Sequence, residues 1–171
     1  MKPSTANRYD AIYREFRWHV PVQFNIAEEC CARWARDTPQ VVAILSEDAS
    51  GAVTAFTYAQ LQAEANRLSN ALARLGVVRG DRVAIVMPQR FETAVAHIAL
   101  FQMGAIGVPL SMLFGPEALE YRLNDGDARV AIVDESGLLL SIGEVAACYR
   151  VGTRAVRTHY ASLRTRLLRL H

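Results

Sequence analysis

The side chains that could act as nucleophiles, acid–base groups or metal ligands are scattered along this chain. Cys30, Cys31 and Cys148 form no C-x-x-C pair, and their odd number argues against a disulfide framework. No basic residue stands beside the cysteine pair to favour a thiolate. His97 has no second ligand at metal-binding spacing, which favours a packed or half-exposed imidazole over a zinc site. We therefore expect no catalytic, cofactor-binding or metal-binding residue.

The sequence also limits how a nucleotide could bind. Lys2 is the only lysine of the chain, which excludes any mechanism that needs a lysine inside a folded site. Gly104 and Gly107 do not have the G-x-G-x-x-G spacing of a dinucleotide loop, and Gly104 is better explained as the end of a helix. Asp134 ends a predicted strand, where a Rossmann acid could bind ribose. That role needs a glycine-rich first turn, which is missing.

Thr57 and Tyr58 are the remaining candidates for ligand contact. Thr57 precedes an apolar helical stripe, and Gln60 follows at the spacing of a capping box. A helix cap and a core aromatic therefore explain the two side chains better than a ligand does.

Strand and helix patterns alternate between residues 56 and 134 and should position any site. Buried-strand patterns and crossover-length helices follow one another with short turns, which predicts right-handed β-α-β units in a parallel sheet. Such sheets usually hold ligands at the carboxyl ends of their strands. The chain is thus predicted to be α/β, with a parallel β-α-β-α-β layer: a helix ending at Gly76, strands at 82–87, 105–110 and 129–134, and helices at 91–103 and 116–123.

Three further elements are predicted before that layer. Residues 9–24 carry aromatic side chains and a proline, typical of an extended arm laid on a neighbouring surface. Asn25 should cap a helix with Glu28 as its capping-box partner, ending at Thr38. Residues 41–45 and 52–56 should form a hairpin.

Length and charge divide the chain unevenly. Its 171 residues suffice for one good core. No apolar run is long enough to span a bilayer, and the polar amino terminus has no signal core, so we expect a cytoplasmic protein. Residues 139–171 are rich in arginine and lack the strand–helix alternation. One arginine every few residues with few aromatics is weak evidence for nucleic-acid binding, so we expect no nucleic-acid partner.

Four segments resemble the adenylate-forming (AMP-binding) enzyme superfamily, which contains the acyl-CoA synthetases. The segment FTYAQL resembles its first core motif, GDRVAIVMP the strand that follows it, and QMGAIGVPL its second core motif. The arm around FRW and PVQFNIA is similar to the start of medium-chain acyl-CoA synthetases. The resemblance covers roughly residues 9–138, and the matching segments lie at residues 56–61, 80–88, 102–110 and 16–27.

This resemblance implies a fragment, residues 1–138, of a ligase in fatty acid metabolism, which joins a carboxylic acid to coenzyme A using ATP and magnesium. The family's phosphate loop and catalytic lysine find no match here, so we carry over no site residue and expect no cofactor in the fragment alone. Residues 139–171 are unlike the family and could be frameshifted or disordered. A non-catalytic Rossmann-like binding or interaction module is the alternative. The sequence does not predict an oligomeric state.

Overall fold

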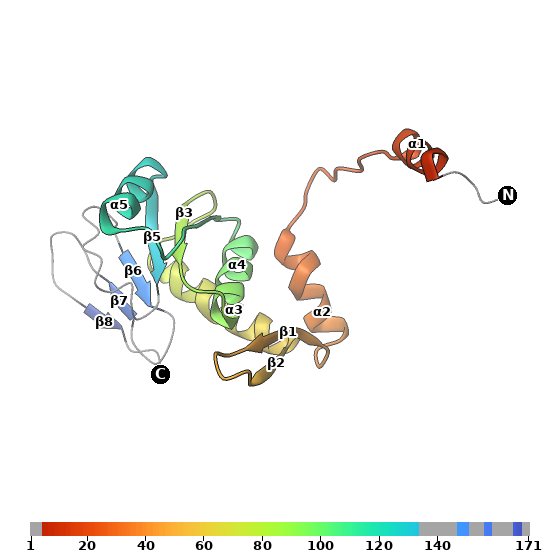
Figure 1. Cartoon of the computed structure of the whole chain (residues 1–171). Helices are drawn as coiled ribbons and strands as arrows, with labels where there is room; N and C mark the ends of the chain where they lie inside the picture. The colour runs from red at the N-terminus through yellow and green to blue at the C-terminus, as the bar shows by residue number, and fades with distance from the viewer. Residues whose placement is uncertain (1–4, 134–146, 151–155, 159–165, 169–171) are drawn as a thin grey trace.

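A computed structural model describes residues 5–133 together with three short strands, at 147–150, 156–158 and 166–168. A parallel sheet in the order β4-β3-β5-β6 forms the body (Figure 1). Its strands are β3 (Arg82–Val86), β4 (Ile106–Pro109), β5 (Ala128–Val133) and β6 (Ala147–Arg150). The predicted parallel β-α-β-α-β layer is confirmed.

The helix before the sheet, α3 (Tyr58–Arg74), begins and ends as its sequence predicts. Thr57 Oγ1 accepts from the Gln60 backbone N–H at 3.3 Å, and Gln60 Oε1 accepts from the Thr57 N–H at 2.8 Å. This reciprocal capping box satisfies two donors that an open helix end would leave unpaired. At the other end Gly76 has a φ of +84°, the left-handed conformation that glycine adopts at little cost.

Two helices complete the crossovers. Helix α4 (Phe91–Met103) lies between β3 and β4 and ends at Gly104, with a φ of +68°. Helix α5 (Pro116–Asp125) lies between β4 and β5 and carries proline at its start, where a missing N–H costs nothing. Both helices lie within two residues of the predicted bounds.

The sheet packs on both faces, because successive strand residues point to opposite sides. Val83 and Ile85 point into the larger core, which α3 and α4 cover, whereas Ala84 and Val86 pack beneath α5. Strand β3 lies in the interior of the sheet, so its last four residues are buried on one face or the other. This explains the continuous apolar run in its sequence.

The expectation that residues 105–110 form a fully buried strand is wrong. Strand β4 lies at the edge of the sheet and pairs with β3, and Ile106 is half exposed. Its apolar composition matches a buried strand, but exposure depends on which elements lie beside it. Gly107 and Pro109 are also typical of short edge strands, which resist pairing with other chains.

The amino-terminal arm, residues 9–24, is only partly extended. Residues 5–15 form a helix, α1 (Thr5–Glu15), followed by an extended segment that leads back to the body (Figure 1). The aromatic side chains of this arm do not lie on a neighbouring surface within the described residues, since Trp18 is 84% exposed and Tyr13 is 73% exposed. The expectation is therefore wrong for residues 9–15, which are helical, and for the packing of these aromatic side chains.

The predicted helix after Asn25 forms, with a π-helical turn (Glu28–Ala32) leading into α2 (Arg33–Asp37). Asn25 Oδ1 accepts from the backbone N–H groups of Ala27 and Glu28, at 2.9 and 3.3 Å. The Glu28 carboxylate instead accepts from the Arg36 guanidinium, which lowers the pKa of Glu28. The expected cap is therefore present, and Glu28 has a different partner from the one predicted.

The hairpin and the last strands complete the description. Strands β1 (Val42–Glu47) and β2 (Val53–Thr57) pair antiparallel, as predicted. Within the arginine-rich segment, β6 pairs parallel with β5, and β7 (Val156–Thr158) pairs antiparallel with β8 (Arg166–Leu168). The division at residues 138 and 139 lies outside the described residues and stays a prediction.

Candidate functional site

The carboxyl edge of the parallel sheet is the first place to look for a site, because loops that follow neighbouring strands meet there. After β3 the chain passes through Met87 and Pro88 into α4, and after β4 it passes through Leu110. The Leu110 N–H donates to the Ile85 carbonyl at 2.9 Å and so extends the sheet by one bond. The segment directly after β5, where the resemblance places the family's phosphate loop, lies outside the described residues.

Three polar side chains that follow β3, those of Arg90, Glu92 and Thr93, are bonded within the protein itself. Arg90 donates to both carboxylate oxygens of Glu92, from Nε at 2.7 Å and from Nη2 at 3.0 Å. Burial is the largest single influence on the pKa of Glu92 and would raise it, but the Arg90 hydrogen bonds, a backbone hydrogen bond and the Arg90 charge together leave that pKa below its usual value. Thr93 Oγ1 donates to the Pro88 carbonyl at 2.6 Å. These bonds fix the turn between β3 and α4.

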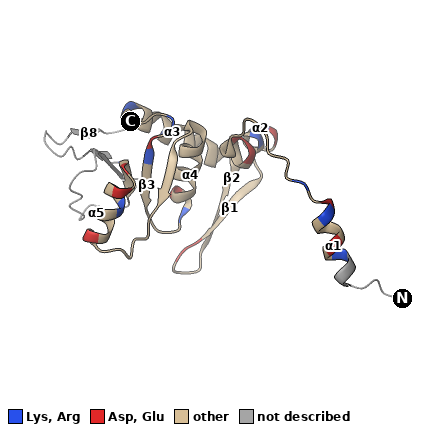
Figure 2. Cartoon of the chain, turned by 90° about the horizontal axis from the view of Figure 1, so that it is seen from above, with Lys and Arg blue, Asp and Glu red and all other residues tan. Residues whose placement is uncertain are grey.

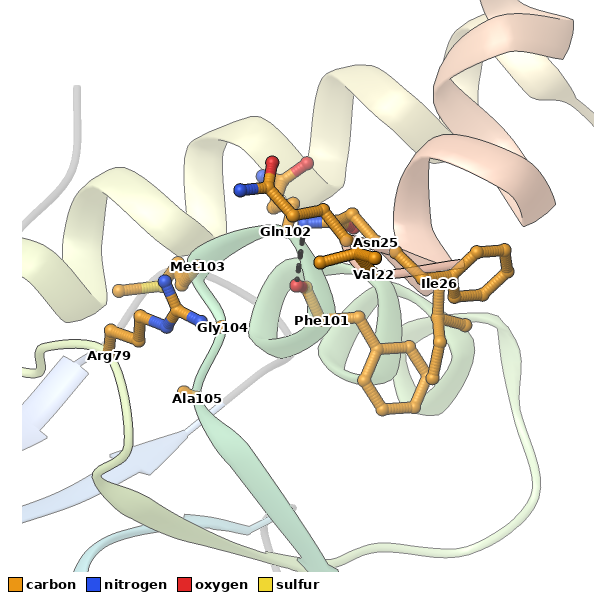
Figure 3. Close-up of a pocket in the computed structure, with 11 residues that line it drawn as sticks. Val22, Asn25, Ile26, Arg79, Phe101, Gln102, Met103, Gly104 and Ala105 are labelled. Atoms are coloured by element: carbon orange, nitrogen blue, oxygen red, sulfur yellow. Dashed lines mark hydrogen bonds between the residues drawn. The ribbon is translucent and has the colours of Figure 1, made fainter. Parts of the chain in front are cut away.

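An open groove of about 700 Å³ lies between the extended arm and the last turn of α4 (Figure 3). Apolar side chains and side-chain amides line it, with a single guanidinium at one end. The residues that define it are Val22, Asn25, Ile26, Arg79, Phe101 and Gln102.

Two contacts explain the shape of this groove. Asn25 Nδ2 donates to the Phe101 carbonyl at 3.2 Å, the bond drawn in Figure 3, and so fastens the arm to a carbonyl at the end of α4. At the other end, the stem of Arg79 lies over Gly104, where a Cβ would come within 3.1 Å of Arg79 Cγ. A cation near the end of α4 also suits the negative pole of its helix dipole. The Asn25 bond therefore holds the arm against the body beside the groove.

Gln102 continues from the groove into a polar network between α3 and α4. Its Nε2 donates to Ser69 Oγ at 2.5 Å, and its Oε1 accepts from Gln62 Nε2 at 2.9 Å. Ser69 Oγ in turn donates to the Ala99 carbonyl at 3.1 Å. Bonds of this kind across a helix pair fix its register, because a shift would leave buried polar groups unpaired.

The residues considered as ligand contacts take structural roles. Thr57 caps α3, and the ring of Tyr58 stacks on Trp34 with centroids 5.8 Å apart. His97 is half-buried near Phe101, and desolvation lowers the pKa of its imidazole. Cys31 is buried, which raises the pKa of its thiol to about 11 and disfavours a thiolate.

The other candidates are not brought together. Gly104 ends α4 as predicted, and Gly107 lies in β4, while Lys2 and Asp134 fall outside the described residues. Over the described ranges, no group of three or more His, Cys, Asp or Glu side chains could hold a metal ion. In the same ranges, no helix has the length and apolar character needed to cross a membrane.

Sequence reasoning did not find Gln102 or the second bond of Asn25. Gln102 lies on the predicted helix 91–103, but its partners are 33 to 40 positions earlier. A polar residue among apolar ones in a buried helix was the only signal for it. The acceptor of Asn25 lies 76 positions later, and no local pattern reveals such a contact.

The chain is similar in sequence to proteins of one enzyme family. A profile of the AMP-binding enzyme family matches residues 31–165. An acetyl-coenzyme A synthetase of Streptomyces coelicolor is 41% identical over 122 residues, which are 71% of this chain and 19% of that protein. Human mitochondrial acetyl-coenzyme A synthetase 2-like is 36% identical over 71% of this chain and 18% of its own length. The chain thus spans about a fifth of the length of the curated relatives it matches.

A solved structure shows the same fold. The acyl-CoA synthetase of Brucella canis superposes with a TM-score of 0.76 and 24% identity, over 84% of this chain and 28% of that one. The family profile covers most of the chain and crosses the predicted boundary at residue 138. Together with the confirmed parallel layer, these matches establish that the chain belongs to the AMP-binding enzyme family.

Proposed function

We propose that this chain is the amino-terminal part of an AMP-dependent acid–CoA ligase and that it does not catalyse the reaction alone. The observation that carries this is the β3-α4-β4-α5-β5 layer, which belongs to a fold shared with an acyl-CoA synthetase, in a chain that is 41% identical over 122 residues to part of an acetyl-CoA synthetase. In this view the chain contributes scaffold, and the rest of an intact enzyme contributes the chemistry.

The reaction of the intact ligase would join an acid to coenzyme A in two steps. The acid first attacks ATP to give an acyl adenylate and pyrophosphate, and the thiol of coenzyme A then displaces AMP. This chemistry needs a cradle of N–H donors and Mg²⁺ around the triphosphate. It also needs a fixed cation to stabilise the charge that develops during adenylation.

The residues of this chain do not fit a triphosphate. At the carboxyl edge the Arg90 guanidinium is bonded to Glu92, and the Thr93 hydroxyl donates to a backbone carbonyl. The sole lysine of the sequence is Lys2, remote from every matched motif. The sequence after Val133 also contains no Gly/Ser/Thr-rich cluster followed by lysine. We therefore assign no step of the reaction to this chain.

The proposal includes a division of the chain at residue 138. Residues 1–138 would form the family-like part, and the arginine-rich residues 139–171 would be a segment of different origin. A reading-frame change in a GC-rich gene could produce such a segment. Translation of the other two frames downstream of Leu138 tests this idea: a phosphate-loop sequence in one of them is expected, and its absence from both would contradict it.

The activity itself is tested by pyrophosphate release. The purified chain is incubated with ATP, Mg²⁺, coenzyme A and either acetate or a medium-chain acid, with the Streptomyces acetyl-CoA synthetase as positive control. We expect release no faster than without protein. Acid-dependent turnover by the chain alone would refute the proposal that it is inactive alone. A cytoplasmic location and the lack of a nucleic-acid partner belong to the same proposal.

A further inference from the structure

Helix α1 carries an exposed apolar stripe that no other described element covers. Tyr9, Ile12 and Tyr13 of the helix and Phe16, the next residue after its end, follow one another at steps of three, one and three. The Phe16 N–H donates to the Ile12 carbonyl at 2.9 Å and continues the last turn, so the four side chains share one side. Their exposed fractions are 70, 59, 73 and 54%. The two tyrosine rings stack on each other, with centroids 6.1 Å apart. The four side chains therefore form one continuous exposed apolar surface.

The position of α1 leaves this stripe without a partner among the described residues of its own chain. Both views place the helix apart from the sheet, at the end of the extended segment (Figures 1 and 2). It has 11 residues, and an isolated helix shorter than about 12 to 15 residues is only marginally stable in water. A partner that covers the stripe would therefore also stabilise the helix.

The charges beside the stripe indicate which partner fits. Arg8 and Glu15 are both exposed and lie seven residues apart, close to two helical turns, so they share one flank of the stripe. Neither has an ion-pair partner among the described residues. Figure 2 shows both charge signs on α1. Charges at such flanking positions set partner choice and orientation when helices pair.

We propose that the stripe on α1 is a self-association surface and that its partner is α1 of a second copy, in antiparallel orientation. In that arrangement Arg8 of each copy lies across from Glu15 of the other, which gives two equivalent ion pairs around a two-fold axis. Ile12 of the two copies meets at the centre, and Tyr9 of each copy lies near Tyr13 of the other. In a parallel pair this flank would face the opposite flank of the partner helix, so Arg8 and Glu15 of the two copies would not face each other.

The small size of this surface predicts a weak dimer. One short helix per copy buries less than the roughly 1,200 Å² of total area that is typical of stable complexes. We therefore expect a dissociation constant in the micromolar range, with monomers at low concentration. Sedimentation measurements on the full chain should show a mass that rises with concentration from 18.9 kDa toward twice that value.

Charge reversal tests the proposal without disturbing the body of the protein. Arg8→Glu places two glutamates on the flank, and Glu15→Arg places two arginines there. Each variant alone should dimerise at least about fivefold more weakly, because two attractive pairs become repulsive. The double variant Arg8→Glu/Glu15→Arg should recover wild-type association. An equimolar mixture of the two single variants should also associate, since each supplies the charges that the other needs.

Each outcome decides for or against the antiparallel pair. Ile12→Asp should abolish dimerisation, because it puts a charge at the centre of the contact. A wild-type chain that stays monomeric up to about 500 µM, well above a micromolar constant, would overturn the proposal. Association, including aggregation, that is equally strong in all charge variants would overturn it too. So would a mixture of the single variants that behaves as the average of its components.

Discussion

Asn25 and Phe101 are joined by a hydrogen bond of 3.2 Å between residues 76 positions apart. The donor is the side-chain amide nitrogen of Asn25, and the acceptor is the Phe101 carbonyl at the end of α4. The amide oxygen of the same side chain, Oδ1, caps the following helix. One side chain thus ends the extended arm, begins a helix and fastens both to the body. Asparagine suits this role because it offers a donor and an acceptor together.

Substitution of Asn25 should separate these two functions. Asn25→Ala loses both and should lower the free energy of unfolding by about 1 to 3 kcal/mol. Asn25→Asp keeps the capping oxygen and loses the donor to Phe101, so it should cost about 1 kcal/mol. Urea unfolding measures both values. Equal losses in the two variants would show that the cap contributes nothing.

The capping box of α3 should contribute to the stability of the protein as helix caps usually do. Thr57→Ala removes the acceptor for the Gln60 N–H and should destabilise the protein by about 1 kcal/mol. Thr57→Ser keeps the hydroxyl and serves as the matched control, with a much smaller effect. Thermal unfolding of the pair tests this, and an alanine variant as stable as the serine variant would contradict it.

Gly104 should tolerate a side chain less well than Gly80 does. Both have positive φ, +68° and +87°, so alanine at either position adds strain of about 1 to 2 kcal/mol. Only at Gly104 does the new Cβ also meet a neighbour, 3.1 Å from Arg79 Cγ, whereas the space beside Gly80 is open. Denaturant unfolding should therefore show a larger loss for Gly104→Ala than for Gly80→Ala.

The same contact predicts how the substitutions combine. In an Arg79→Ala background the neighbouring stem is gone, so Gly104→Ala should cost no more than Gly80→Ala does. An undiminished difference between the two alanine variants in that background would show that Arg79 is not the cause.

His97 should make stability depend on pH in mildly acidic solution. Burial lowers its pKa in the folded state below the ordinary value of about 6.5, so the unfolded chain takes up the proton first. Stability from this group is fully present above pH 6.5 and decreases as the pH falls from there toward the lowered folded pKa. His97→Gln should reduce the decrease in unfolding free energy between about pH 6.5 and 5. Identical pH profiles for the two proteins would contradict this.

Local sequence signals predicted most of the framework. Thr57 with Gln60, and the glycines at positions 76 and 104, mark helix ends because their bonds and backbone angles are set within a few residues. The apolar run of β3 likewise predicts burial on both faces, which the interior position of the strand confirms. In these places the local preference and the fold agree.

Expectations failed where the outcome depends on distant neighbours. Strand β4 has a buried-strand composition but lies at the sheet edge, and Glu28 binds Arg36 two turns later. Tyr9, Ile12, Tyr13 and Phe16 have helical spacing, but the aromatic and proline-containing composition of residues 9–24 favours an extended arm and so does not predict helix α1. The groove between the arm and α4 could not be predicted, since it depends on the path of that arm.

The central claim is that this chain provides scaffold without a nucleotide site. Titration calorimetry of the full chain with ATP and Mg²⁺, and separately with AMP, tests it most directly, with the Streptomyces acetyl-CoA synthetase as positive control. We predict no saturable heat up to about 1 mM nucleotide, a limit that corresponds to about −4 kcal/mol of binding free energy. Saturable binding of one nucleotide per chain would contradict the claim and favour a Rossmann-like binding module instead.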